Sequence, residues 1–190
     1  NIGNASFVRL PPDGYTLLLA TSTTNSAGPN LFSKLGFHPI DDFAPIALAA
    51  VAPSVLVVRA EAPYKSYKDV VEAAKAKPGK LSYGSGGSGN SAHLSASLFA
   101  KETGIDVLHV PYKGPPLIDV VSGQIPLCVE PAASAIPMIN AGKVRAIAYS
   151  GSHRHAQLPN VPTISETYPA VAVVGWHGVW APTGVPNEVV

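Results

Sequence analysis

Along the second half of the chain, short apolar runs alternate with segments whose apolar residues recur at helical spacing. The apolar runs predict strands at 81–83, 105–110, 125–129 and 144–149. The segments between them predict helices at 91–103, 117–121 and 132–140. Strands that alternate with helices are typical of a parallel sheet with crossover connections. The pattern therefore predicts an α/β fold.

The first third of the chain is richer in strands. The turn Pro11-Pro12-Asp13-Gly14 precedes a predicted strand at 15–20, and further strands are expected at 45–51, 54–59 and, much later, 173–181. Ser66 and Asp69 have the spacing of a capping box, which predicts that a helix begins at Tyr67 and runs to Lys77.

Composition narrows the classes of function. Apolar residues make up 46% of the 190 residues, charged residues 13%, and the formal net charge is +1. A disordered chain needs more charge, and a nucleic-acid surface needs a clustered basic face, so we expect neither. The longest apolar run, 45–58, is too short to span a bilayer and contains Pro53. Cys128 is the single cysteine, which excludes an internal disulfide, and its apolar surroundings predict a buried side chain.

Polar residues follow three of the predicted strands. They are the run Gly84–Asn90, then Tyr112-Lys113-Gly114, and then Glu130. The loops after parallel strands emerge at one edge of the sheet, where ligands bind in folds of this kind. The polar stretch 21–26 also follows a strand, and we expect it in a second lobe.

The residues of the glycine-serine run, Gly84–Asn90, are suited to binding an anion. The run leads from a strand into a helix, and free N–H groups at a helix start carry partial positive charge. Glycines such as Gly87 and Gly89 let a ligand approach the backbone, and donors come from Ser85, Ser88, Ser91 and Asn90. We therefore expect a carboxylate to bind here.

Other interpretations of this run are weaker. It fits G-x-G-x-x-G, but Asp106 lies at the beginning of the next strand, whereas a dinucleotide site needs an acidic residue near that strand's end. A flexible turn remains an alternative. A serine hydrolase needs G-x-S-x-G, and Asn90 stands in place of the last glycine. His93 fits a capping or packing role better than that of a base. We assign no catalytic residue and no cofactor.

Metal binding is not predicted either. His153 and His155 lie two residues apart in a loop, and the sequence indicates no third ligand.

Several segments recur in the same order in one family. They are Asn1-Ile2-Gly3, Pro12–Leu19, Lys77–Ser85, Ser91-Ala92-His93-Leu94, His109–Gly114, Ser122-Gly123-Gln124-Ile125 and Leu158–Thr163. From end to end the chain resembles the Bug receptors, the substrate-binding proteins of tripartite tricarboxylate transporters. The resemblance implies a two-lobed α/β, periplasmic-binding-protein-like (type II, Venus flytrap) fold. One lobe, 60–172, would be complete, and the other, 1–59 with 173–190, would be partial, since the family has a signal peptide and a first strand–loop–helix before Asn1 and helices after Pro186.

The resemblance also implies a function. The protein would be a monomeric periplasmic receptor that captures a di- or tricarboxylate, an amino acid or a related acid in a cleft between the lobes and presents it to membrane transporter subunits. Matching positions assign ligand binding to Ser22 and Thr23 in one lobe. In the other lobe they assign it to Ser85, Gly87, Ser88, Gly89, Asn90, Ser91, Tyr112, Lys113 and Gly114.

Glu130 stands where the family often has an aspartate. It could bind a ligand ammonium group or repel a second acid group, and both readings stay open. The alternative function is a cytoplasmic effector-binding domain of a transcription regulator, which predicts a DNA-binding module upstream; a serine hydrolase is a weaker alternative.

Overall fold

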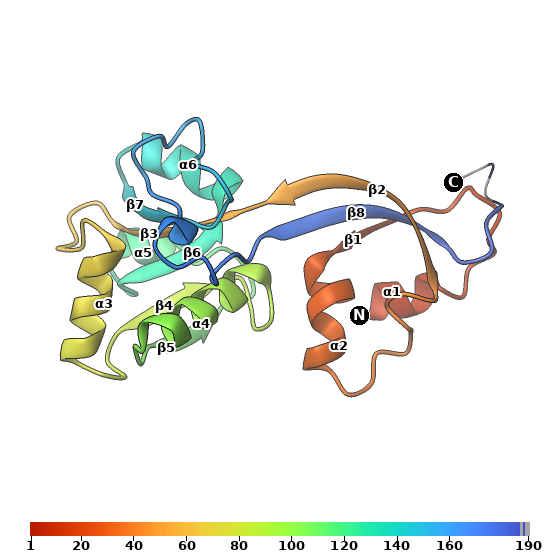
Figure 1. The fold of residues 1–190 in the computed structure, drawn as a ribbon, viewed down its shortest axis with the longest axis horizontal. Helices are drawn as coiled ribbons and strands as arrows, with labels where there is room; N and C mark the ends of the chain where they lie inside the picture. Colours follow the sequence, from red (N-terminus) through yellow and green to blue (C-terminus); the bar gives the residue numbers. More distant parts are fainter. Residues whose placement is uncertain (187, 189–190) are drawn as a thin grey trace. The chain divides into compact units, whose positions relative to one another are not determined.

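The computed structural model of the chain describes residues 1–186 and 188 (Figure 1). These residues form two compact units, Asn1–Val51 with Gly175–Val190 and Ala52–Val174. We refer to them as unit 1 and unit 2. In the part of the chain that is described, no helix is long and apolar enough to cross a membrane.

Unit 2 is a three-layer α/β/α unit. Its elements in chain order are β3 (Ser54–Arg59), α3 (Tyr67–Ala76), β4 (Ser82–Ser85), α4 (Ser91–Thr103), β5 (Leu108–Pro111), α5 (Leu117–Ser122), β6 (Leu127–Pro131), α6 (Ala132–Asn140), β7 (Val144–Tyr149) and the 3₁₀ helix η2 (Ile164–Glu166). The helices at Ser91–Thr103 and Ala132–Asn140 and the strands at Ser54–Arg59 and Val144–Tyr149 begin and end at the residues that the sequence predicts.

The sheet of unit 2 is mixed, whereas the sequence pattern predicts a parallel one. Its strand order is β5-β4-β6-β3-β7. Strand β4 runs parallel to β5 and β6, but β3 lies between β6 and β7 and is antiparallel to both. Residues 54–58 of β3 are all buried, as expected of a central strand with both faces covered. The strand at 54–59, which the sequence assigns to the first lobe, is therefore hydrogen-bonded within unit 2.

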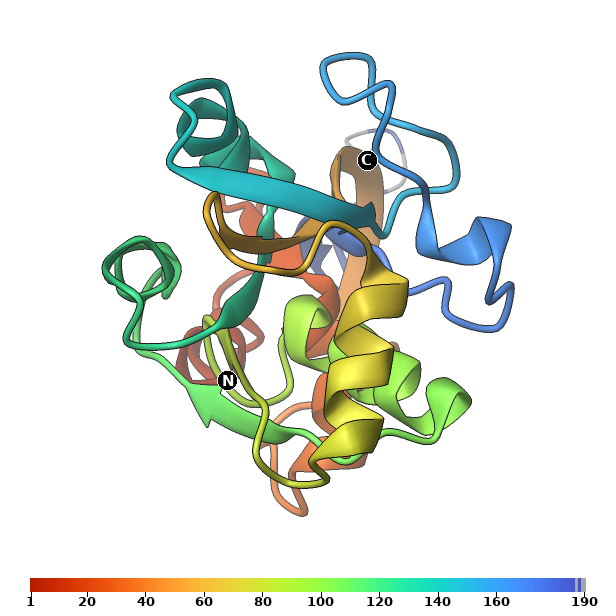
Figure 2. The ribbon, with the colours of Figure 1, turned by 90° about the vertical axis from the view of Figure 1, so that its left-hand side faces the viewer.

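Each face of this sheet has its own hydrophobic core, and Figure 2 shows the helices that cover the sheet on both sides. Leu56 and Val58 of β3 pack with α3 and α4 on one face, and Val55 and Val57 pack with α5 and α6 on the other. Successive side chains of a strand point to opposite faces, so a run of consecutive apolar residues supplies both cores.

Local signals define the ends of two helices. Ser66 and Asp69 form the predicted capping box at the start of α3. Helix α4 begins after Asn90 and ends at Gly104, whose left-handed backbone (φ 66°) is a conformation that glycine adopts readily.

Unit 1 contains α1 (Ile2–Phe7), β1 (Leu18–Thr21), the π-helix η1 (Thr23–Ala27), α2 (Gly28–Leu31), β2 (Phe43–Ala52) and β8 (Gly175–Pro182). Its three strands have the order β1-β8-β2. β1 is antiparallel to β8, with Leu18 opposite Trp180. The polar stretch 21–26, which reads as a loop in the sequence, is mostly π-helical, and Thr21 and Thr24 are hydrogen-bonded to each other across its first turn.

Candidate carboxylate site

The loops after β4, β5 and β6 lie at one edge of the sheet in unit 2. Ser85 is in register with Pro111 of β5, and Gly84 is in register with Cys128 of β6, all in parallel pairing. The N–H of Tyr112 donates to the carbonyl of Ser85 at 2.9 Å. The predicted residues of the glycine loop (86–90), the Tyr112 loop and Glu130 thus follow neighbouring parallel strands.

The glycine loop has a backbone that only glycine adopts without strain. Gly87 has φ 134° and Gly89 has φ 82°, both in the region that side chains disfavour. Ser88, between them, is exposed, and Gly89 is buried. This backbone leaves the hydroxyl of Ser88 open to solvent at the turn.

The glycine loop ends at the start of α4, a helix of 13 residues. The side-chain oxygen of Asn90 accepts from the N–H of His93 at 2.8 Å and so caps the helix. The first N–H groups of a helix, here those of Ser91 and Ala92, have no acceptor within the helix, and the helix dipole adds positive potential. The start of α4 can therefore bind an anion.

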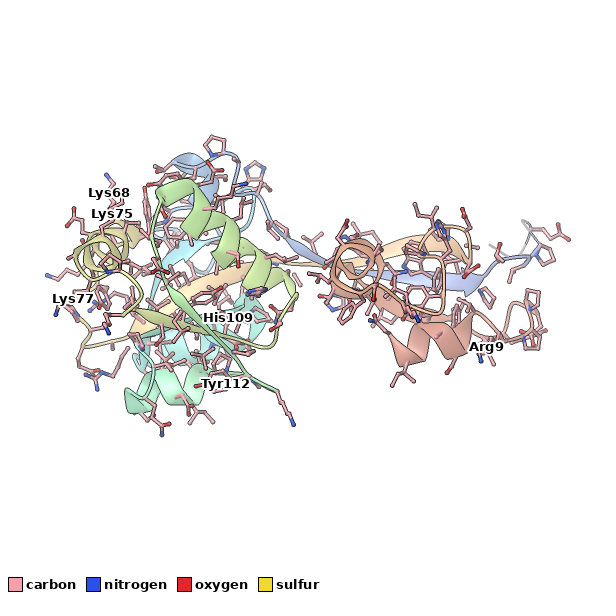
Figure 3. The ribbon with its side chains drawn as sticks, turned by 90° about the horizontal axis from the view of Figure 1, so that it is seen from below. Arg9, Lys68, Lys75, Lys77, His109 and Tyr112 are labelled. Carbon is pink, nitrogen blue, oxygen red and sulfur yellow. The ribbon has the colours of Figure 1, made fainter. Side chains whose placement is uncertain are left out.

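Ser85 points inward instead. It is wholly buried, and its Oγ lies 2.8 Å from Nε2 of His109 and 3.2 Å from the carbonyl of Gly87. Figure 3 labels His109 on β5. The serine–histidine pair has the spacing of a nucleophile and base, but a hydroxyl without exposure cannot reach a substrate. Ser85 is placed to hold the turn of the glycine loop.

His93 holds the other end of the glycine loop. Its Nδ1 accepts from the N–H of Gly89 at 3.1 Å, and its ring stacks on that of His109 with centroids 4.0 Å apart. Burial lowers the pKa of both imidazoles, and the proximity of His93 lowers that of His109 further.

Tyr112, Lys113 and Gly114 follow β5. The Tyr112 hydroxyl donates to Oδ2 of Asp119 on α5 at 2.7 Å, and this bond to a carboxylate raises the pKa of Tyr112 to about 12. Lys113 and Gly114 are exposed. Figure 3 shows Tyr112 at the end of β5. The bond to Asp119 ties the Tyr112 loop to the helix that follows it.

Glu130 is buried near the end of β6, with 3% of its surface exposed. Its Oε2 accepts from the hydroxyl of Ser134 on α6 at 3.0 Å. Burial raises the pKa of the Glu130 carboxyl, although the bond from Ser134 acts in the opposite direction. The same burial raises the pKa of the Cys128 thiol.

Ser22 and Thr23 belong to unit 1. Oγ of Ser22 accepts from the N–H of Trp176 at 3.4 Å, and Thr23 is the first residue of η1. Nearby, the side chain of Asn25 is buried, and its oxygen accepts from Asn4 and Thr24, while its Nδ2 finds no hydrogen-bond partner among the described residues. This polar cluster is built from short side chains without charge.

Metal binding has no candidate group in the described part of the chain, where no three His, Cys, Asp or Glu side chains gather. His155 instead packs edge-on against Tyr149, with ring centroids 5.7 Å apart.

The spacing of Asn90 and His93 suits an N-cap and the third helical residue, so a contact between these two residues could be predicted from the sequence. Two other contacts of the site are not evident in the sequence. The pairing of Ser85 with His109 depends on the register of β4 against β5, which no local pattern encodes. The bond from Tyr112 to Asp119 joins residues that are seven positions apart in the sequence, and no local pattern predicts it either.

In an α/β sheet with helices on both faces, ligands bind beside the polar loops at such an edge, and the fold is that of the periplasmic binding proteins, the class to which similar solved structures belong. Within that class, a family model described as "Tripartite tricarboxylate transporter family receptor" matches residues 2–190, and the chain belongs to this family. The match confirms the resemblance found in the sequence and does not favour a transcription regulator.

Individual proteins of known sequence or structure are also similar to this chain. A protein of Pseudomonas sp. (strain P51), "UPF0065 protein in tcbD-tcbE intergenic region", is 38% identical over 100% of this chain and 57% of its own length. The solved structure "R. palustris Rpa4515 with adipate" has a TM-score of 0.90 and 32% identity over 99% of this chain and 64% of that one. "MatC (Rpa3494) from Rhodopseudomonas palustris with bound malate" has a TM-score of 0.85 and 30% identity over 99% of this chain and 65% of that one. The chain thus spans less than two thirds of each of these proteins.

Proposed function

We propose that the whole protein is a periplasmic receptor that captures a small dicarboxylate and presents it to the membrane subunits of a tripartite tricarboxylate transporter. The observation that carries this proposal is the glycine loop, which leads through Gly87 and Gly89 into the capped start of α4. Family membership supports the receptor role.

In this proposal one carboxylate of the ligand binds at the glycine loop. It accepts from the N–H groups of Ser91 and Ala92 and from the exposed hydroxyl of Ser88, while Asn90 keeps the helix start in place. Each such bond to a charged group contributes about 1–3 kcal/mol. Three or four of them suffice for micromolar affinity, about 8 kcal/mol, without a buried arginine.

Other residues complete the proposed ligand set. The exposed ammonium group of Lys113 supplies a positive charge beside Gly114, and the aromatic ring of Tyr112 contributes a contact for the ligand. Ser22 and Thr23 of unit 1 offer hydroxyl groups. Glu130 is buried near the end of β6, and burial raises its pKa and so opposes the charged carboxylate that would repel an acid group of the ligand.

A dicarboxylate is proposed first because two of the similar solved structures contain adipate and malate. The glycine loop itself selects for a carboxylate and not for the rest of the molecule. Chain length and substituents are therefore the variables to test.

The experiment is isothermal titration calorimetry of the whole protein with adipate, malate, citrate, aspartate and adipamide. We expect adipate or malate to bind with micromolar affinity and adipamide, which lacks both charges, to show no heat. Equal binding of adipamide and adipate would contradict a carboxylate site. Recovery of the protein from a periplasmic fraction as a monomer in light scattering tests the proposed location and assembly.

A further inference from the structure

The N–H of Gly89 donates to Nδ1 of His93 at 3.1 Å. A backbone N–H can only donate, so Nδ1 must carry a lone pair, and the ring is neutral with its proton on Nε2. In the same turn, Asn90 accepts from the N–H of His93. The two contacts resemble a capping box, except that His93 accepts from Gly89, the residue before the N-cap, and not from the N–H of the N-cap residue Asn90 itself.

We propose that His93 is a positioning residue for the glycine loop, and that a proton on its Nδ1 releases Gly89 and with it the ligand-binding form of the loop. The effect on ligand rests on the function proposed above; the effect on Gly89 does not. Ligand binding would then weaken in mildly acidic solution.

Gly89 needs such a restraint. Its backbone is held at φ 82°, and the residue is buried although its neighbour Ser88 is exposed. A protonated Nδ1 turns an acceptor into a second donor that faces the N–H of Gly89. Two facing donors repel, and the buried N–H is left without a partner, which costs free energy.

The groups around His93 disfavour its charged form. Its ring stacks on His109, which in turn lies 5.0 Å from the ring of Tyr83 on β4 and bonds to Ser85. Helix α4 has no acidic residue in its first turn, and its basic residue, Lys101, is in the last turn. Among the described residues no carboxylate affects the pKa of either imidazole. The positive end of the helix dipole adds to this effect.

The formed glycine loop should be less stable in acid. Burial lowers the pKa of His93 when the loop is formed, so the open loop takes up a proton first as the pH falls below about 6.5. The formed loop therefore loses stability as the pH falls from about 6.5 and keeps it above that value. A single proton changes the equilibrium by at most tenfold per pH unit.

The test is a pH titration of the isotope-labelled whole protein by NMR between pH 7.5 and 5.5. At pH 7.5 we expect His93 in the Nε2–H tautomer, and on acidification we expect the Gly89 amide signal to shift together with the His93 ring. His93→Gln keeps an acceptor that cannot be protonated, so its Gly89 signal should stay constant over the range. His153→Gln, at an exposed histidine of unit 2, should behave as the unchanged protein does.

A proton on Nδ1 at pH 7.5, or a Gly89 signal that ignores the titration of His93, would overturn the proposal. A Gly89 shift that persists in His93→Gln would do the same. Each of these results is independent of any ligand.

Calorimetry with adipate supplies the second readout. We expect a three- to tenfold loss of affinity between pH 7.5 and 5.5 in the unchanged protein and in His153→Gln, and no loss in His93→Gln. Affinity that rises on acidification would overturn the link to binding, because His93 would then act as a cation for the ligand. Absence of adipate binding at every pH would count against the proposed function, while the behaviour of Gly89 would still decide the role of His93.

Discussion

The hydroxyl of Tyr112 donates to Oδ2 of Asp119 at 2.7 Å, and this bond joins the loop after β5 to the first turn of α5. The acceptor is a carboxylate, so the bond stabilises the protonated phenol and raises the pKa of Tyr112 to about 12. Tyr112 thereby anchors the loop that precedes α5 twice, through its hydroxyl to Asp119 and through its backbone N–H to the carbonyl of Ser85.

Tyr112→Phe should lower the free energy of unfolding by about 1 kcal/mol at pH 7, since one partly exposed hydrogen bond is lost. Because the pKa is raised, the stabilisation is present below pH 10 and disappears as the pH rises toward 12. Urea unfolding at pH 7 and at pH 11.5 measures the difference. A loss that is as large at pH 11.5 as at pH 7 would argue against the bond to Asp119.

Ser88→Asp should abolish binding of a carboxylate ligand, because a fixed negative charge would occupy the turn where the ligand's charge is proposed to bind. Calorimetry with adipate measures it. Ser152→Asp makes the same change at another exposed serine of unit 2 and should leave affinity unchanged. Unaltered affinity in Ser88→Asp would remove the glycine loop from the site.

Glu130→Gln should leave the protein as stable or more stable at pH 7.5. The raised pKa of Glu130 means that burial opposes its charged form, so its contribution is favourable at pH below 4.5 and declines as the pH rises through the folded-state pKa. Glutamine keeps the bond with Ser134 and carries no charge. Urea unfolding at pH 7.5 and pH 4.5 should show a stability advantage of the variant only at the higher pH; the reverse order would contradict this account.

Gly84→Ala should destabilise the protein by about 1–3 kcal/mol, the cost of overpacking a core. A Cβ atom on Gly84 would lie 2.7 Å from side-chain atoms of both Ile125 and Pro116. Gly114→Ala has nothing within 4 Å of the added atom and should change stability little. Thermal unfolding of the two variants makes the comparison, and equal melting temperatures would show that Ile125 and Pro116 yield without cost.

The sequence by itself determined those features that depend on neighbours within a few residues. The capping pair Ser66–Asp69 could be predicted directly, because a capping box is formed over four consecutive residues. The strands could be found because their apolar runs must reach a core.

Only the tertiary structure decided which strands are neighbours. The apolar sequence of residues 54–58 is compatible with a strand at the edge of a sheet and equally with the observed position between β6 and β7, where both faces are buried. The pairing of Ser85 with His109 likewise required the register of β4 against β5. Strand order, direction and register arise from contacts between distant segments, and the hydrophobic period that reveals a strand is the same for every partner it could take.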